Sequence, residues 1–220
     1  MNQFEVDKMN RKAWIDAMDS LLPKKAIDRL LDKFRQPGAS SLQQIKKDML
    51  LKYGIKGKSV FQPCCHNGKE LVSMKNLGAS RCVGFDFCPS FIAAAKEIAI
   101  AAGQECEFVE TDVYNIDSQY AGQFDIAYIS VGTLMWLPDL GGFFNVVSEL
   151  MREGAWMFLI EQHPLVDMYG LEPSRKKRFR RFKESYFRHE PYKVVHGLNY
   201  QYLKSNPESS RQVLFSVITH

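Results

Sequence analysis

The N-terminal stretch, Met1 to Trp14, lacks a long apolar run and mixes charges of both signs. Neither a secretory signal nor a membrane-spanning helix is therefore predicted there, since both need one. The chain also lacks the cysteine spacing of a disulfide-stapled domain: its five cysteines include an adjacent pair and lie in or beside apolar runs, at Cys64, Cys65, Cys82, Cys88 and Cys106. This usage is typical of reduced, buried thiols, so a cytoplasmic protein without membrane association is the default prediction.

The excess of positive charge is confined to one segment. The net charge is +4, but Arg175–Lys183 holds seven basic residues and no acid, so the rest of the chain is acidic overall. Proteins that read RNA are usually basic over a wider surface, which argues against a nucleic-acid partner despite the interleaved aromatic residues. A solvated helix and a clamp for an anionic substrate remain. We favour a lid that closes, with the N-terminal helices, over a ligand.

Strand-like and helix-like periodicities alternate through the middle of the chain. The strand-like runs are Ser59–Gln62, Arg81–Asp86, Glu107–Val109, Phe124–Ser130 and Trp156–Glu161, and the helical runs between them are Lys69–Leu77, Pro89–Ala102 and Gly142–Met151. Such alternation implies right-handed crossovers and a parallel sheet covered on both faces. The expected fold class is α/β, a doubly wound (Rossmann-like), mostly parallel sheet with N-terminal helices and a C-terminal basic and aromatic cap.

The segments on either side of this core have different patterns. Val6–Phe34 predicts two short amphipathic helices broken near Pro23, and Leu42–Tyr53 predicts another. After His163 the alternation stops, and three further strand-like runs follow, at Tyr192–Val195, Asn199–Leu203 and Val213–Thr219. We therefore expect a helical cap over 1–57, a core over 58–164 and a basic, aromatic cap with a β-hairpin over 165–220.

The turn after the first core strand has few glycines. It reads FQPCCHNG, with Gly68 as its one glycine, whereas a dinucleotide needs G-x-G-x-x-G to bring bare backbone to its pyrophosphate. Asp86 and Asp112 end the next two strands, where a ligand crevice is expected. Asp86 could accept the hydrogens of a ribose diol, and Asp112 those of an adenine amine. S-adenosylmethionine has no phosphate and therefore fits this turn better than a dinucleotide.

Five runs in order, FQPCCHNG, LGASRCVGFDF, FVETDVYNI, FDIAYISVGTLMWLPDL and FLIEQHP, resemble class I S-adenosylmethionine-dependent methyltransferases, together with NRKAW near the N-terminus. The resemblance covers about Lys58 to Pro164 and is strongest to small bacterial-type members with a Cys- and His-containing first turn. It implies a cofactor set of Gln62, Cys64, His66, Gly68, Asp86, Phe87, Asp112, Val113, Ser130, Val131 and Gly132. The family at large has an acid at the position of Gln62 and glycines at those of Cys64 and His66.

The sequence gives fewer signals for the residues that would contact the substrate. We place Trp14, Trp136 and His163 among them, with His163 as a candidate general base and Glu161 as a weaker one. Trp136 could equally belong to the core, and His163 could be structural. Asp125 is expected to cap or pair structurally. Adjacent residues on one turn cannot easily converge on a metal, so no metal site is predicted at Cys64, Cys65 and His66.

Members of this superfamily end in a helix and an antiparallel hairpin after the fifth strand, whereas here the last strand-like run ends at His220. We hypothesise that the final helix and hairpin are missing. The predicted function is transfer of a methyl group from S-adenosyl-L-methionine to oxygen or nitrogen of a small molecule, because the sulfonium is an activated leaving group that needs mainly alignment. The alternatives are a cofactor-binding protein without transfer activity and an RNA methyltransferase that uses residues 175–183.

Overall fold

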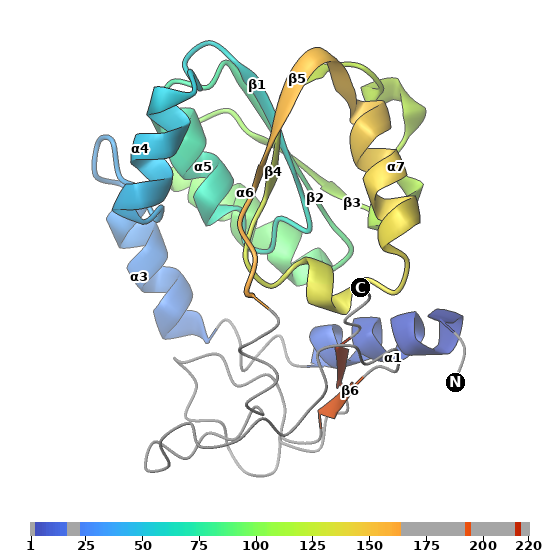
Figure 1. Ribbon diagram of the computed structural model, residues 1–220. Coiled ribbons are helices and arrows are strands. Elements are labelled where there is room, and N and C mark those ends of the chain that lie inside the picture. Colours follow the sequence, from blue (N-terminus) through green and yellow to red (C-terminus); the bar gives the residue numbers. More distant parts are fainter. Residues whose placement is uncertain (1–2, 17–22, 164–191, 195–213, 217–220) are drawn as a thin grey trace, which may run out of the picture. The chain divides into compact units, whose positions relative to one another are not determined.

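The computed structural model describes residues 3–16, 23–163, 192–194 and 214–216 (Figure 1). The chain divides into two compact units, one of residues 1–21, 130–140 and 160–220 and the other of residues 22–129 and 141–159. The basic segment 175–183 and the expected strand 199–203 lie outside the described residues. In the described part of the chain, no helix has the length and apolar character needed to cross a membrane.

The larger unit is built on a five-stranded, all-parallel sheet in the order β3-β2-β1-β4-β5. Its strands are β1 (Ser59–Pro63), β2 (Arg81–Asp86), β3 (Glu107–Glu110), β4 (Phe124–Ile129) and β5 (Met151–Leu159). The strand order reverses beside β1, which is the doubly wound arrangement that places ligands at the carboxyl ends of the strands. The predicted fold class is therefore confirmed for the sheet.

Burial along the strands follows their place in the sheet. Every residue of β4 is buried, as are four of the five in β1, whereas the edge strands β3 and β5 are partly exposed. Central parallel strands are covered on both faces and therefore read as continuous apolar runs. The prediction for β5 was wrong at its start: the strand begins at Met151 and not at Trp156, because Arg152, Glu153 and Gly154 are exposed and carry no apolar signal.

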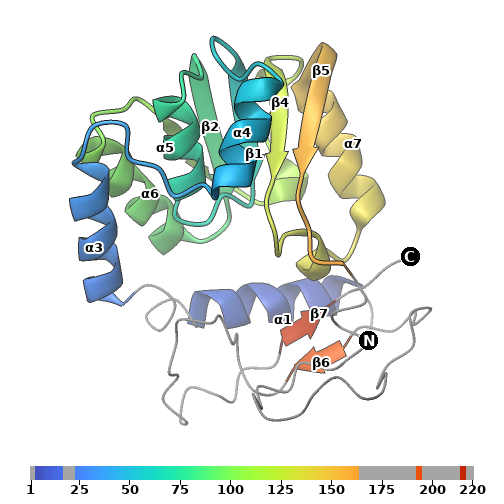
Figure 2. The same ribbon diagram turned by 60° about the vertical axis from the view of Figure 1, so that its left-hand side comes forward.

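Helices cover both faces of the sheet. Figures 1 and 2 show α5 (Lys69–Asn76) and α6 (Pro89–Ala101) on one side and α7 (Leu140–Leu150) on the other, as right-handed crossovers require when the strand order reverses. Two further helices, α3 (Lys24–Phe34) and α4 (Gln44–Lys52), precede β1, and α3 packs against α6. Between β3 and β4 the chain makes only two 3-10 turns, Val113–Asn115 and Ser118–Tyr120.

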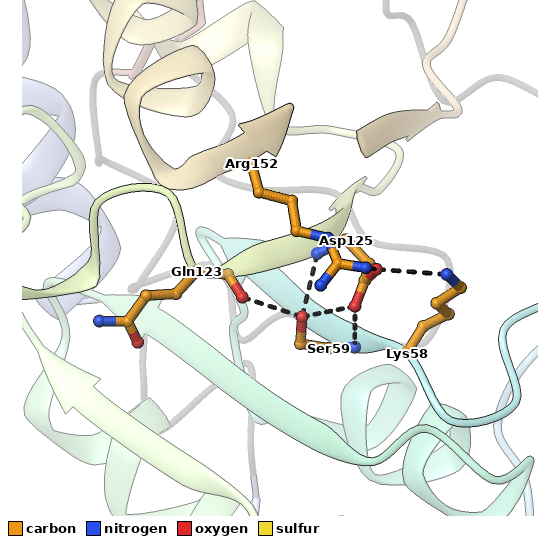
Figure 3. A network of polar contacts seen from close by, with 5 residues as sticks. All are labelled: Lys58, Ser59, Gln123, Asp125 and Arg152. Atoms are coloured by element: carbon orange, nitrogen blue, oxygen red, sulfur yellow. Dashed lines mark hydrogen bonds and ion pairs between the residues drawn. The ribbon is translucent and has the colours of Figure 1, made fainter. Parts of the chain in front are cut away.

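A polar cluster joins three strands at the amino end of β1 (Figure 3). The Asp125 carboxylate accepts hydrogen bonds from the Ser59 backbone nitrogen and hydroxyl, both at 2.8 Å, and pairs with Lys58 at 3.3 Å and with Arg152. Burial raises the pKa of Asp125, but the bonds from Ser59 and Lys58 and the charge of Arg152 outweigh it, so the pKa lies below its ordinary value. The structural role expected for Asp125 is confirmed.

The smaller unit contains α1 (Gln3–Asp16), a 3-10 turn over Leu134–Trp136, and a two-stranded antiparallel sheet of β6 (Tyr192–Val194) and β7 (Leu214–Ser216). In this small sheet Lys193 is in register with Phe215. The short strands fall inside two of the three strand-like runs expected after His163. The helix expected before Pro23 and the one after it are α1 and α3.

Candidate functional site

The turn after β1 has an unusual backbone. Cys64, His66 and Gly68 all have positive φ, at 54°, 52° and 64°, and α5 begins directly afterwards at Lys69. Left-handed backbone costs a residue with a side chain about 1–2 kcal/mol, and glycine alone avoids this cost. Cys64 and His66 therefore adopt a backbone conformation that glycine would adopt without this cost. Such strain persists only where the surroundings impose it.

Contacts with the neighbouring strand and helix hold this turn in place. The Cys65 nitrogen donates to the Phe85 carbonyl at 2.9 Å, and the His66 nitrogen donates to the Asp86 carboxylate at 2.8 Å. The His66 ring lies against the Phe91 ring of α6, with centroids 3.8 Å apart and planes at 32°. These contacts fix the backbone of the turn from β2 on one side and from α6 on the other.

Asp86 is the acid at the carboxyl end of β2, and only 7% of it is exposed. Besides the bond from His66, its carboxylate accepts the Cys88 nitrogen at 3.0 Å, just before α6. Burial raises its pKa to about 6 against these backbone hydrogen bonds. A carboxylate offers about four acceptor positions, so the backbone donors of His66, Phe87 and Cys88 leave one position for a ribose hydroxyl. Asp86 therefore ties the turn to β2 and keeps acceptor capacity.

The electrostatics of the turn show which groups lie together. The pKa of Cys64 is raised by burial and then by the charges of Asp86 and Asp112, so the acids that end β2 and β3 both act on this turn. Burial likewise raises the pKa of Cys65, and it lowers the pKa of His66 to about 4, with Lys69 adding to the effect. The thiols are protonated and the imidazole is neutral at neutral pH, which disfavours a nucleophilic cysteine here.

The remaining predicted cofactor residues of this unit lie beside the turn or at the next strand end. Gln62 is 2% exposed in β1, and Phe87, half-buried, follows Asp86. Asp112 caps the 3-10 turn after β3 by accepting the Tyr114 nitrogen at 3.0 Å, and Val113 is buried within it. The structure thus brings Gln62, Cys64, His66, Gly68, Asp86, Phe87, Asp112 and Val113 to the carboxyl ends of β1, β2 and β3.

A buried ion pair in the same unit was missed by the sequence prediction. The Lys46 ammonium of α4 lies 2.7 Å from the Glu70 carboxylate in the first turn of α5, and the two side chains are 8% and 16% exposed. Tyr128 of β4 is fully buried, and burial and then Glu70 raise its pKa. An acid in the first turn is a recognised sequence signal for the start of a helix, but nothing in the sequence indicates that Glu70 pairs with Lys46.

In the smaller unit, Glu161 holds the loop that follows β4. Its carboxylate accepts the backbone nitrogens of Gly132, Thr133 and Leu134 at 2.6, 3.0 and 2.9 Å. Those bonds are charge-assisted and lie at the start of a 3-10 turn, where a negative charge is stabilised. Glu161, the weaker of the two candidate bases, is therefore a loop anchor. Ser130 and Val131 open the same loop, with Val131 51% exposed.

Two of the predicted substrate-side residues meet in this unit. The Trp14 ring of α1 contacts the Trp136 ring edge to face, with centroids 5.7 Å apart, and the Asn10 side chain donates to the Trp136 carbonyl at 3.4 Å. Trp14 is buried, and His163 is exposed after the Glu161 anchor. Within the described residues, no group of three or more His, Cys, Asp or Glu side chains is placed to hold a metal ion.

Comparisons with known proteins support the fold. Residues 60–154 match a family model described as a methyltransferase domain. The structure is similar to that of a protein from Methanococcus maripaludis assigned as an S-adenosyl-L-methionine-dependent methyltransferase, with a TM-score of 0.50 and 14% identity over 63% of each chain. It is also similar, with a TM-score of 0.50 and 21% identity, to a protein studied in the conversion of a disulfide bond into a thioacetal group during echinomycin biosynthesis.

In the second comparison, 65% of this chain matches 58% of the other. The chain thus spans less than two thirds of the length of either protein. At these identities the likeness establishes the fold. A search of curated protein sequences finds no significant match.

Proposed function

We propose that the chain is a class I S-adenosylmethionine-dependent methyltransferase that transfers a methyl group from S-adenosyl-L-methionine to an oxygen or nitrogen of a small molecule. The match of residues 60–154 to a methyltransferase domain supports this proposal. The observation that carries the proposal is the Asp86 carboxylate. It ends β2 beside the left-handed turn and keeps an acceptor position beyond those taken by the backbone nitrogens of His66, Phe87 and Cys88. A ribose diol is the part of the cofactor that this acceptor suits.

The residues around Asp86 fit the rest of the cofactor. Gln62, Cys64, His66 and Gly68 would hold the methionine part; Phe87 would lie against the adenine, and Asp112 with Val113 would meet its edge. The turn carries no free thiolate and no charged imidazole, because burial keeps Cys64 protonated and His66 neutral. When bound, the cofactor supplies a methyl group already activated by the sulfonium. The protein then contributes alignment and exclusion of water.

On the acceptor side, the loop anchored by Glu161 would place Ser130, Val131 and Gly132 near the sulfonium. Trp136, held against Trp14, would form an apolar wall for the acceptor. His163 follows the same anchor and is exposed, so it would take the proton that an attacking hydroxyl or amine loses.

Calorimetry with S-adenosylmethionine and its demethylated product, S-adenosylhomocysteine, tests the proposal. Asp86→Asn keeps the shape of the side chain but removes its charge, and the loss of charged hydrogen bonds of about 1.5–3 kcal/mol corresponds to about 10- to 100-fold weaker binding. Asp117→Asn is the matched control, because Asp117, like Asp86, accepts the backbone nitrogen two residues later in the chain but is exposed. Failure of the wild type to bind either compound would overturn the proposal.

The same titration has an expected pH dependence. Because the pKa of Asp86 is raised to about 6, the acid becomes protonated as the pH falls through that value and loses acceptor capacity. Affinity for S-adenosylhomocysteine should therefore fall below about pH 6 in the wild type and stay flat in Asp86→Asn. Methyl transfer is then assayed with a panel of hydroxyl- and amine-bearing small molecules, where binding without any transfer would favour a non-catalytic cofactor-binding protein.

A further inference from the structure

Two cysteines at the amino ends of β2 and β3 are neighbours across the sheet. Val83 of β2 is in register with Glu107 of β3, so Cys82 and Cys106, one residue earlier on each side, are the next pair. Paired residues of parallel strands project to the same face, and adjacent strands lie about 4.8 Å apart. A disulfide needs a Cα separation of about 4.4–6.8 Å, a range that includes this strand spacing.

The two thiols already interact. A side-chain contact with the Cys106 sulfur and burial together raise the pKa of Cys82. The same contact lowers the pKa of Cys106, with the Lys75 ammonium acting in the same direction against burial. Cys106 is half-buried, whereas Cys82 is 1% exposed. The pair therefore joins an accessible sulfur with thiolate character to a protonated thiol behind it, which is how an attacking and a resolving cysteine are arranged.

We propose that Cys82 and Cys106 form an oxidisable dithiol, which a peroxide converts into a disulfide that fastens the edge strand β3 to β2. The Cys106 thiolate attacks one peroxide oxygen, so the O–O bond breaks, hydroxide leaves and a sulfenic acid remains. The Cys82 sulfur then attacks the Cys106 sulfur and displaces the second hydroxide. Two thiols are oxidised, one peroxide is reduced, and the thiol protons end in two molecules of water.

The other three cysteines are poor competitors for this reaction. Burial raises the pKa of Cys64, Cys65 and Cys88, so little thiolate is available at any of them. The dithiol also lies at the amino ends of its strands, whereas Asp86 lies at the carboxyl end of β2. Oxidation should therefore leave the turn and the affinity for S-adenosylhomocysteine unchanged, and the proposal does not depend on methyl transfer.

Peptide mapping of the full-length protein tests this inference. The reduced protein is treated with a small molar excess of hydrogen peroxide, blocked with a thiol reagent and digested with trypsin without reduction. Cleavage after Arg81, Lys96 and Arg152 gives peptides 82–96 and 97–152, which carry Cys82 and Cys106 respectively. We expect these two peptides to be linked, the intact mass to fall by two hydrogen atoms, and a dithiol reductant to separate them again.

Peptide 82–96 also contains Cys88, which provides the matched control. Cys88→Ser should keep the link and Cys82→Ala should abolish it, while fragmentation of the linked wild-type peptide locates the bond even if a variant fails to fold. A melting temperature several degrees higher after oxidation is expected, because the disulfide restricts the unfolded chain. No link, a link through Cys88, or Cys106 oxidised alone to a sulfinic acid would each overturn the proposal.

Discussion

Replacing Gly68 with alanine places a methyl group where the core has no room. A Cβ there would lie 2.5 Å from the Phe108 ring and 2.8 Å from the Ala95 methyl group, and the residue has φ +64°. The left-handed backbone costs about 1–2 kcal/mol and overpacking of a well-packed core about 1–3 kcal/mol. The total loss in the free energy of unfolding is therefore about 2–5 kcal/mol.

Gly103 provides the matched control, because its φ is +60° and a Cβ there would meet nothing within 4 Å. Gly103→Ala should cost only the backbone part, and both substitutions reduce the entropy of the unfolded chain equally. The difference between the variants, about 1–3 kcal/mol, then isolates the close approach of Phe108. Urea unfolding followed by circular dichroism measures it. Equal losses in the two variants would refute the reasoning from packing.

Three further outcomes follow from the polar contacts. Lys46→Met leaves the Glu70 carboxylate without its partner and should lower the free energy of unfolding by about 3 kcal/mol. The double variant Lys46→Met, Glu70→Leu should recover most of that loss, as measured by urea unfolding. Additive losses from the two substitutions would contradict this. Because the pKa of Asp125 is depressed in the folded protein, this carboxylate stabilises the fold above its ordinary pKa, and the stabilisation is lost as the pH falls through the folded value. Asp125→Asn should therefore flatten the dependence of the melting temperature on pH between about pH 5 and pH 1. A pH profile parallel to that of the wild type would contradict this. Glu161→Ala removes the acceptor for the amides of residues 132–134, whose hydrogen exchange should accelerate; unchanged protection would count against the anchor.

The sheet was predictable because each strand is an apolar run that can be recognised in the sequence. The alternation of apolar strands with helical runs fixes the parallel, doubly wound arrangement, and β2 was predicted with both of its ends correct. The prediction fails where a strand leaves the core: β5 starts with Arg152, Glu153 and Gly154, which are exposed and show no apolar periodicity. Turns of three residues, as between β3 and β4, are too short for any periodicity to detect.

The sequence indicated which residues lie at the carboxyl ends of the strands, but it did not indicate the backbone conformation of the turn. Acids at two strand ends indicate a crevice, but the left-handed backbone at Cys64 and His66 cannot be read from residues that rarely adopt it. Glu161 was considered as a base because it ends a run near the crevice. Its role as an anchor depends on three amides from a loop about 30 residues away, which only the folded chain brings to it.

The cluster around Asp125 joins segments that the ribosome synthesises at different times. Ser59 leaves the ribosome 66 residues before Asp125, and Arg152 emerges later still. Since β4 is the neighbour that covers one edge of β1, this apolar strand has an open edge throughout the synthesis of β2, α6 and β3. An open apolar edge invites pairing with other chains. The interval of translation between Ser59 and Asp125 is thus when the nascent protein is most exposed to misassembly.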